Sequence, residues 1–238
     1  MAGSAASDYD AYAEKYAETV AQREQDGTGD SYGLLPPLLE ELGDIAGHRV
    51  LDAGCGEGYL TRVLAARGAV ATGIDVSPRL IERARQKDPA GQIDYRVADL
   101  SQPQPDLAGR FDATVSYLVL NDVRDWPGFA ATLASSLRPG GRLVHVINNP
   151  YTAILNGHGT DYFDSGAASP YRGFWAMGIK IYYYHRTLED FLDAFLTAGL
   201  HLTKLADLPA RADDHPPYTC LPAGTRFPRF MLLAFALP

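Results

Sequence analysis

Residues 50–58 read Val-Leu-Asp-Ala-Gly-Cys-Gly-Glu-Gly, and this stretch decides the fold. Its apolar start predicts a short buried strand, and its three glycines predict a tight turn that opens a helix. Downstream, residues 73–77 (Gly-Ile-Asp-Val-Ser) predict the end of the next strand, with a carboxylate at Asp75. Glycines let a ligand approach the backbone, and an acidic residue about 20 positions on can bind a ribose diol. The two segments therefore predict a nucleotide-type pocket.

The spacing of the glycines distinguishes between classes of ligand. A turn that binds a dinucleotide has the order Gly-x-Gly-x-x-Gly, with the pyrophosphate on backbone N–H groups at the helix start. Residues 54–58 instead have the order Gly-x-Gly-x-Gly, and Asp52 stands just before the first glycine. A carboxylate there would repel a pyrophosphate, whereas it suits a ligand that carries an ammonium group. The turn therefore favours a cationic ligand without phosphate.

This acidic-x-Gly-x-Gly-x-Gly pattern resembles the signature of class I S-adenosylmethionine (SAM)-dependent methyltransferases. The chain resembles small-molecule members of this family, of the type 11/12 kind, from about Arg49 to its C-terminus. Leu-Arg-Pro-Gly-Gly at 137–141, before an apolar run, is also common in the family. The resemblance implies SAM as the cofactor and S-adenosyl-L-homocysteine (SAH) as its product.

Composition limits the class of protein. A chain of 238 residues is long enough for one large α/β domain. Its net charge of −8 argues against nucleic acid as the main partner. No segment has the apolar length of a membrane span, the N-terminus lacks the features of a signal peptide, and two cysteines (Cys55 and Cys220) are too few for a disulfide framework. We therefore expect a cytoplasmic monomer or homodimer that acts on a small molecule.

Predicted strands and helices alternate through the central part of the chain. The expected strands are 49–53, 70–74, 93–97, 111–117, 143–147, 200–205 and 230–237. Helices are expected between them, at 59–67, from Ser77-Pro78 to about Lys87, at 127–137, and from Thr187 to Gly199. This alternation predicts an α/β fold with a mostly parallel sheet and helices on both faces. The resemblance implies a Rossmann-like, doubly wound sheet of seven strands with the last one antiparallel.

Two segments depart from the alternation inside this single domain of residues 1–238. An N-terminal helical cap is expected at 8–45, where Tyr9, Tyr12 and Tyr16 share one helix face. That face could be a lid over the cofactor or a packing face. An aromatic-rich insert at 148–186 is expected to act as a substrate lid, because long loops in compact domains are often binding loops. Ordinary packing or a dimer contact is the alternative role of the insert.

The ligand is expected outside the carboxyl ends of the strands, near the switch point between the first and fourth strands. Gly54 and Gly56, with Cys55 between them, would admit the methionine part of SAM, and Asp52 would lie near its ammonium group. Asp75 would accept both ribose hydroxyls or, alternatively, cap the following helix. The remaining expected cofactor residue from this region is Val76, which would pack on the adenine.

Further cofactor residues follow from the resemblance. Asp99 would accept the adenine amino proton, with the backbone of Ala98 and Leu100 beside it; a plain turn aspartate is the less favoured alternative. Tyr117, just past the fourth strand, would line the methionine side. In many relatives a tyrosine of the N-terminal helix closes over the cofactor, and Tyr9, Tyr12 or Tyr16 could take this role, with Tyr16 included among the expected cofactor residues.

Three histidines are candidates for a general base. His145 is flanked by valines, which favours a core histidine, and His158 lies in the insert. His185 is preferred, because its Tyr-His-Arg-Thr-Leu run enters the pocket side in similar enzymes. Relatives often have a histidine where this chain has Asn121, which could instead hydrogen-bond a substrate. No metal site is expected, because the histidines and carboxylates lack ligand spacing.

The sequence thus predicts methyl transfer from SAM to an O, N or C atom of a small molecule such as a secondary metabolite. The aromatic insert would favour a planar, apolar acceptor. The first alternative keeps the fold and the cofactor but catalyses a reaction without methyl transfer, such as a cyclisation. A nicotinamide oxidoreductase is disfavoured by the glycine spacing, and a non-catalytic interaction module by the intact cofactor motif. Asn149-Pro150-Tyr151 resembles the Asn-Pro-Pro-Tyr motif of amino-methyltransferases, but it follows the fifth strand and lacks the second proline.

Overall fold

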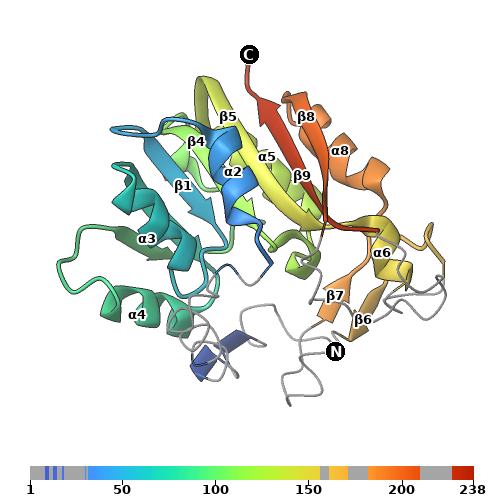
Figure 1. Cartoon of the computed structure of the whole chain (residues 1–238), viewed down its shortest axis with the longest axis horizontal. Helices are drawn as coiled ribbons and strands as arrows, with labels where there is room; N and C mark the ends of the chain where they lie inside the picture. The colour runs from blue at the N-terminus through green and yellow to red at the C-terminus, as the bar shows by residue number, and fades with distance from the viewer. Residues whose placement is uncertain are drawn as a thin grey trace.

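The computed structural model describes residues 9–10, 13–14, 18, 30, 32–155, 161–170, 182–209 and 227–238. Its centre is a seven-stranded sheet in the order β3-β2-β1-β4-β5-β9-β8 (Figure 1). The strands are β1 (Arg49–Ala53), β2 (Val70–Asp75), β3 (Asp94–Val97), β4 (Phe111–Tyr117), β5 (Leu137–Asn148), β8 (His201–Pro209) and β9 (Pro228–Ala236). Neighbours from β3 to β5 pair in parallel, and β9 is antiparallel to both β5 and β8. The predicted mostly parallel sheet with an antiparallel last strand is confirmed.

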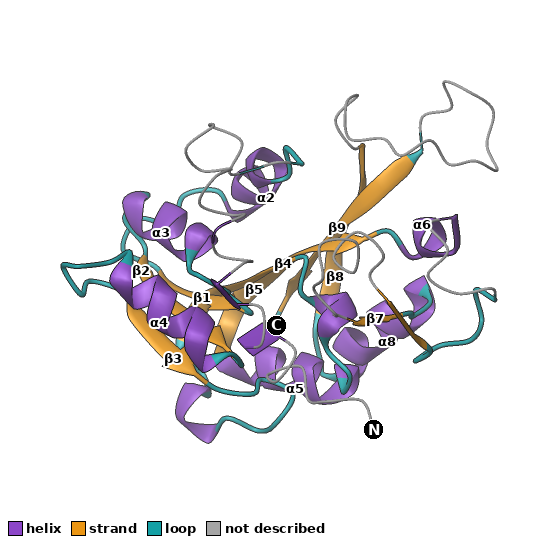
Figure 2. Cartoon of the chain, turned by 90° about the horizontal axis from the view of Figure 1, so that it is seen from below, coloured by secondary structure: helices purple, strands orange, loops and turns teal. Residues whose placement is uncertain are grey.

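Helices cover both faces of this sheet, as Figure 2 shows. On one face, α2 (Leu35–Leu42) and α3 (Tyr59–Ala66) bury Leu38 and Leu64 against the strands. On the other face, α5 (Trp126–Ser136) and α8 (Leu188–Thr197) bury a second apolar cluster. A third cluster joins α4 (Pro78–Gln86) to Cys55 and Tyr95. The doubly wound α/β architecture is therefore confirmed, and none of the described helices is long and apolar enough to cross a membrane.

Local signals begin two of these helices where the sequence predicts. Ser77 caps α4 by accepting the N–H of Leu80 at 3.2 Å, and Pro78 occupies the first helical turn. At α8, Thr187 Oγ1 accepts the N–H of Asp190, and the Asp190 carboxylate accepts the N–H of Thr187 in return. Such reciprocal bonds satisfy N–H groups that a helix start leaves without partners.

The strand β5 is longer than the prediction of 143–147. It begins at Leu137, directly after α5, and therefore includes the Arg-Pro-Gly-Gly segment, which lies between the predicted helix at 127–137 and the predicted strand at 143–147. Leu137 pairs with Phe111, and the register then shifts before Ala113 pairs with Arg142. A bulge of this kind places extra residues on one strand without ending the pairing. The four residues of this segment therefore lie within β5 instead of separating the strand from α5.

The insert contains secondary structure that the sequence interpretation left as loop. It carries α6 (Pro150–Leu155), and β6 (Ala168–Pro170) pairs antiparallel with β7 (Tyr182–Tyr184) as a separate two-stranded sheet. Two strands alone are marginally stable in water. Here β7 packs against the short 3-10 helix η2 (Leu120–Asp122) that follows β4. Figure 1 shows β6 and β7 at the edge where β1 and β5 end, which is the edge expected to bind the ligand.

His145 lies in the core, as its flanking valines predict. Its side chain is fully buried in β5, with the Phe195 ring 4.7 Å and the Trp126 ring 6.5 Å from the imidazole, centroid to centroid. Neither ring nitrogen has a hydrogen-bond partner among the described residues. Burial lowers the pKa of His145 to about 3, because the charged form would lose its hydration.

This buried histidine predicts a loss of stability in mild acid. Its folded pKa is below the unfolded value of 6.5, so the unfolded chain binds the extra proton as the pH falls from 6.5 towards 3. At pH 5 the free energy of unfolding should be about 2 kcal/mol lower than at pH 8 from this residue alone. In His145→Phe that part of the pH dependence should disappear in urea denaturation. His201→Phe, at an exposed histidine, is the control and should leave that part of the pH dependence in place.

Candidate functional site

The turn between β1 and α3 adopts backbone angles that glycine reaches without strain. The φ angles of Gly54, Gly56 and Gly58 are 79°, 55° and 84°, all in the left-handed region. The N–H groups of Gly54 and Cys55 both donate to the carbonyl of Ile74, at 2.8 and 3.0 Å. The turn is therefore fastened to the end of the neighbouring strand β2.

Side chains crowd two of these glycines. A Cβ on Gly54 would lie 2.5 Å from Cγ2 of Val119, which precedes η2. A Cβ on Gly58 would lie 2.5 Å from the hydroxyl oxygen of Tyr95 on β3. The turn thus packs against β3 and against the segment that follows β4. A larger residue at either glycine would have to displace the Tyr95 or the Val119 side chain.

Asp75 ends β2 and binds the backbone with both of its carboxylate oxygens. Oδ2 accepts the N–H of Gly56 at 2.9 Å, and Oδ1 accepts the N–H of Ser77 at 2.9 Å. Each carboxylate oxygen has two lone pairs, so each can accept one more hydrogen bond. Asp75 is half-buried, and burial raises the pKa of its carboxyl above its usual range. It can therefore support the turn and still bind a pair of hydroxyls.

Asp52 lies beneath the turn at the end of β1. It is 1% exposed, and its Oδ2 accepts the hydroxyl of Thr61 at 2.6 Å. Burial raises the pKa of Asp52 to about 7; the Thr61 bond opposes this shift and the charge of Asp75 adds to it. Two desolvated carboxylates thus flank the glycine turn, and together they favour a positively charged ligand.

The structure places the other predicted cofactor residues around the same strand ends. Val76 is half-buried after Asp75, and the Ala98 N–H donates to the Asp75 carbonyl at 3.0 Å. Leu100 belongs to the core cluster on the α5 face. The Cys55 side chain packs with α4 and Tyr95, so only its backbone is available at the turn. Burial also raises the pKa of the Cys55 thiol.

Asp99 has the contacts of a turn aspartate. Its side chain is exposed, and Oδ1 accepts both the N–H of Ser101 at 2.9 Å and the Ser101 hydroxyl at 2.6 Å. Its carbonyl accepts the side-chain amide of Gln104 at 3.0 Å. These bonds fix the loop after β3 and hold Asp99 near the end of that strand.

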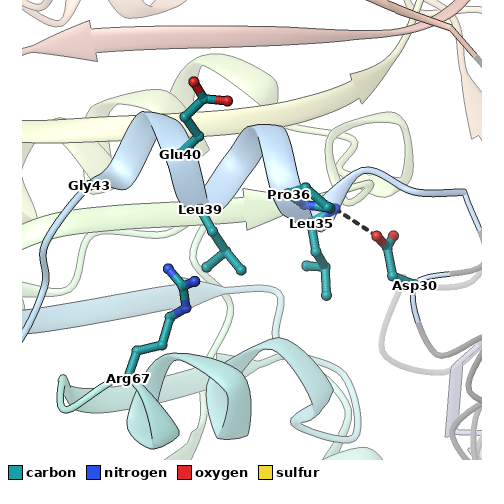
Figure 3. A pocket seen from close by; sticks show the side chains of 7 residues that line it. All are labelled: Asp30, Leu35, Pro36, Leu39, Glu40, Gly43 and Arg67. Carbon is teal, nitrogen blue, oxygen red and sulfur yellow. Dashed lines mark hydrogen bonds between the residues drawn. The ribbon is translucent and has the colours of Figure 1, made fainter.

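Tyr117 connects β4 to the segment before α2. Its hydroxyl donates to Asp30 Oδ1 at 3.1 Å, and the same carboxylate accepts the N–H groups of Leu34 and Leu35. Asp30 also lines a depression along α2 with Leu35, Pro36, Leu39, Glu40, Gly43 and Arg67 (Figure 3). This depression contains no residue of the glycine turn, and it is separate from the site at the strand ends.

The described N-terminal residues contact the strand ends. Tyr9 donates its hydroxyl to Asp122 Oδ2 at 2.8 Å, and Asp10 Oδ1 accepts the hydroxyl of Ser77 at 2.5 Å. The segment thus reaches the residues that follow both β4 and β2, as a lid would. Tyr12 and Tyr16 lie outside the described residues, as do His158 and Cys220.

His185, the predicted base, joins the insert to the start of α8. It is 1% exposed, and its Nε2 lies 2.7 Å from the carbonyl of Tyr162. Its backbone also bonds Gly166 and Ala167. A carbonyl oxygen can only accept, so Nε2 is the donor in this contact, and Nδ1 is the ring nitrogen left to contact another group. Nδ1 is buried and has no partner among the described residues.

The residues after β4 carry the polar groups that sequence reasoning only partly identified. Asn121 is 1% exposed, and its Oδ1 accepts the amide of Asn148 at 3.3 Å. Asp122, which the prediction left unassigned, follows it and binds Tyr9. Its position just past a parallel strand was the available signal. Across the described chain, no group of histidine, cysteine and acidic side chains could hold a metal ion.

Comparison with known proteins identifies the family. The family described as "Methyltransferase domain" matches residues 51–145. A ubiquinone biosynthesis O-methyltransferase of Xanthomonas oryzae pv. oryzae (strain PXO99A) is 39% identical over 171 residues, which cover 63% of this chain and 71% of that protein. A solved SAM-dependent methyltransferase from Mesorhizobium loti has a TM-score of 0.67 and 25% identity, and the match covers 84% of this chain and 96% of that one. This chain belongs to the SAM-dependent methyltransferases.

Other curated relatives match a shorter part of this chain. A demethylmenaquinone methyltransferase of Tropheryma whipplei (strain Twist) is 43% identical over 104 residues, 43% of each chain. The chain spans about half the length of several curated relatives that it matches.

The site of the methyltransferase fits SAM in three respects. Asp75 has lone pairs available for ribose hydroxyls, and Asp52 and Asp75 supply negative charge for a sulfonium and an ammonium group. The glycine turn also has backbone angles that need no Cβ.

Substitution of Gly54 should show how tightly the turn is packed. Gly54→Ala would combine a left-handed φ with the clash on Val119, and we expect a loss of about 1–3 kcal/mol in urea denaturation. Gly91→Ala is the matched control, because Gly91 has a φ of 63° but no atom within 4 Å of its would-be Cβ. Gly54→Ala should cost more than Gly91→Ala, and adding Val119→Ala should recover part of the difference. Equal costs at both glycines would contradict the packing argument.

The raised pKa of Asp52 predicts pH-dependent SAM binding. A cationic ligand favours the ionised carboxylate, and Asp52 becomes neutral as the pH falls below about 7. The SAM affinity measured by calorimetry should therefore fall about tenfold between pH 8 and pH 6. Asp52→Asn should bind SAM more weakly and show a smaller change over this range. Asp106→Asn, at an exposed carboxylate, should behave as the unmodified protein.

Proposed function

We propose that this chain transfers the methyl group of SAM to a small aromatic acceptor. The observation that carries the proposal is the contact of the Asp75 carboxylate with the glycine turn, at 2.9 Å from Oδ2 to the Gly56 nitrogen. It sets a ribose-binding carboxylate beside a turn suited to a cation without phosphate. SAM supplies an electrophilic methyl carbon on a sulfonium, and the protein must place a nucleophile near it and exclude water.

The proposed cofactor contacts follow the strand ends. Asp75 binds the ribose hydroxyls, and Val76 packs on the adenine. Gly54 and Gly56 admit the methionine part, with Asp52 near its ammonium group. Asp99, with Ala98 and Leu100, lies at the adenine end, and Tyr117 and an N-terminal tyrosine such as Tyr16 complete the proposed set.

The names of the relatives and the aromatic insert support the class of acceptor. The two curated relatives described above carry names that refer to ubiquinone biosynthesis and to demethylmenaquinone. In the described part of the insert, the rings of Tyr151 and Tyr162 stack at 5.1 Å with an interplanar angle of 13°. Phe163 meets Tyr162 edge-on. We therefore propose that the insert 148–186 covers a planar acceptor and that the cap 8–45 closes over the cofactor.

The contacts of the two predicted catalytic residues suggest different parts for them. Asn121 is proposed to hydrogen-bond the acceptor, because its side-chain nitrogen is buried and unpartnered among the described residues. His185 is proposed to hold the insert against α8 through its Tyr162 contact. A role of His185 as the base would have to use the buried Nδ1.

Binding and labelling experiments test this function. SAM and SAH should bind at micromolar levels in calorimetry, and Asp75→Ala should weaken both about 100-fold, because two hydrogen bonds to a charged acceptor are lost. Asp106→Ala is the control at an exposed site. With methyl-labelled SAM and a panel of hydroxylated benzenes and naphthalenes, label should appear in product.

Three results would change the conclusion. Failure of both SAM and SAH to bind would overturn the proposal. Bound cofactor with product formed but no label in it would favour the alternative reaction without methyl transfer. Tight NADH binding in a fluorescence titration would point to an oxidoreductase instead.

A further inference from the structure

Two adjacent side chains after β4 contain buried polar atoms without partners. The side-chain nitrogen of Asn121 and the Oδ1 of Asp122 have no hydrogen-bond partner among the residues that the structure describes. Leaving such groups without hydrogen bonds costs free energy, so we expect them to hydrogen-bond a ligand in the functional complex. A donor and an acceptor on neighbouring residues suit a ligand that has a hydroxyl group and a second oxygen.

These two residues lie next to the cofactor turn. Leu118, which directly follows β4, has a φ of 57°, an uncommon value for a residue with a side chain. Strained backbone of this kind is found where a chain must be redirected at a functional site. Beyond it, Val119 is packed so closely on Gly54 that a Cβ there would clash, and η2 follows at once. The short helix therefore presents Asn121 and Asp122 beside the turn.

Asp122 is surrounded by titratable groups from three other elements. Tyr9 of the N-terminal segment donates to Asp122 Oδ2 at 2.8 Å. The charge of Asp75, at the end of β2, raises the pKa of Asp122, and the charge of Asp122 raises the pKa of Tyr183 in β7. Burial raises the pKa of Asp122 to about 7, the Tyr9 bond lowers it, and the charge of Asp75 raises it. At neutral pH this carboxyl can therefore take up a proton or release one, as a general base requires.

The other candidates for a base at this edge each have a hydrogen bond that supports the fold. Asp52 is buried under the turn and bound to Thr61, and both oxygens of Asp75 hold backbone N–H groups. His185 contacts the Tyr162 carbonyl through Nε2. Asp122 differs from these carboxylates because its Oδ1 is buried with no hydrogen-bond partner among the described residues, and because it follows Val119, which packs on the glycine turn.

We propose that Asp122 is the residue that accepts the proton of a hydroxyl-bearing acceptor, that Asn121 binds a neighbouring oxygen of the same acceptor, and that Tyr9 is a positioning residue for Asp122. The inference rests on the proposed function and adds to it the atom methylated, which is oxygen. It also gives Tyr9 of the N-terminal segment a part in catalysis, because the Tyr9 hydroxyl donates to Asp122.

The proposed step balances in atoms and charge. The acceptor oxygen forms a bond to the methyl carbon while the bond from that carbon to sulfur breaks, and the electron pair stays on sulfur as a neutral thioether. The hydroxyl proton passes to Asp122 Oδ1. One positive and one negative charge, on the sulfonium and the carboxylate, disappear together, and neutral products remain in a site that excludes water.

Binding of catechol to the SAH complex tests the inference without turnover. Catechol carries a hydroxyl donor beside a second oxygen, and calorimetry should show it binding more tightly at pH 8 than at pH 6, because ionised Asp122 accepts a stronger hydrogen bond than neutral Asp122. Asp122→Asn should weaken binding at pH 8 at least tenfold and remove the pH dependence. Asp106→Asn is the matched control and should do neither.

Two pH measurements separate a catalytic role from a structural one. In the unmodified protein, kcat/KM for catechol should rise with pH to a plateau above about 7, and Asp122→Asn should lower the plateau by a factor on the order of 100 to 10,000. Tyr9→Phe should shift the midpoint to higher pH, since it removes the bond that lowers the pKa of Asp122. Carbon-13 NMR of labelled aspartate in the absence of substrate should show that Tyr9→Phe raises the pKa of Asp122 in the same direction.

The outcomes are distinct from those of the proposed function. If SAH binds but catechol neither binds nor is methylated, this inference fails, while methyl transfer to carbon or nitrogen stands. Unchanged catechol binding and an unchanged pH profile in Asp122→Asn would also overturn it. If SAH itself does not bind, the proposed function fails and this inference fails with it.

Discussion

The carboxylate of Asp75 connects the parts on which the site depends. By accepting the N–H of Gly56 it joins the end of β2 to the turn after β1, and by accepting the N–H of Ser77 it fixes the start of α4. The carbonyl of Ile74, one residue earlier, receives two N–H groups of the same turn. These bonds hold the glycines in left-handed conformations and leave their backbone open to a ligand. The end of β2, the glycine turn and the start of α4 are thus joined by one small network of hydrogen bonds.

Electrostatic strain is concentrated at the same edge. Asp52, Asp75 and Asp122 lie near one another there, and burial raises the pKa of all three. A folded protein gains nothing in stability from desolvated carboxylates, because their charged forms lose hydration. In the proposed function, a cationic cofactor would restore favourable interactions at Asp52 and Asp75, and a hydroxyl-bearing acceptor would do so at Asp122. The buried Glu57 shows the contrast, since Lys87 and Arg62 already pair with it.

How far the fold could be predicted depends on whether its signals are local. The glycine turn, the strand ends at Ala53 and Asp75 and the caps at Ser77 and Thr187 follow from residues a few positions apart, and the structure has them where expected. The predicted start of β5 was wrong because proline and glycine in the Arg-Pro-Gly-Gly segment are typical of a break between elements, whereas the pairing of Leu137 with Phe111 across a bulge keeps the segment in the sheet. The β6–β7 pair was missed because it is stabilised by contact with η2, which no local pattern reveals.

The sequence by itself determined the order of strands and helices, the cofactor class and the residues at the strand ends, since periodicity, glycine spacing and the resemblance are properties of the chain. Tertiary structure decided which polar groups meet. It brought Tyr9 to Asp122 across 113 positions, bound Tyr117 to Asp30 and engaged His185 with Tyr162. It also buried Asn121 and Asp122 beside the turn. Desolvation and long-range hydrogen bonds set the pKa of a carboxyl, and both exist only once distant segments have packed together.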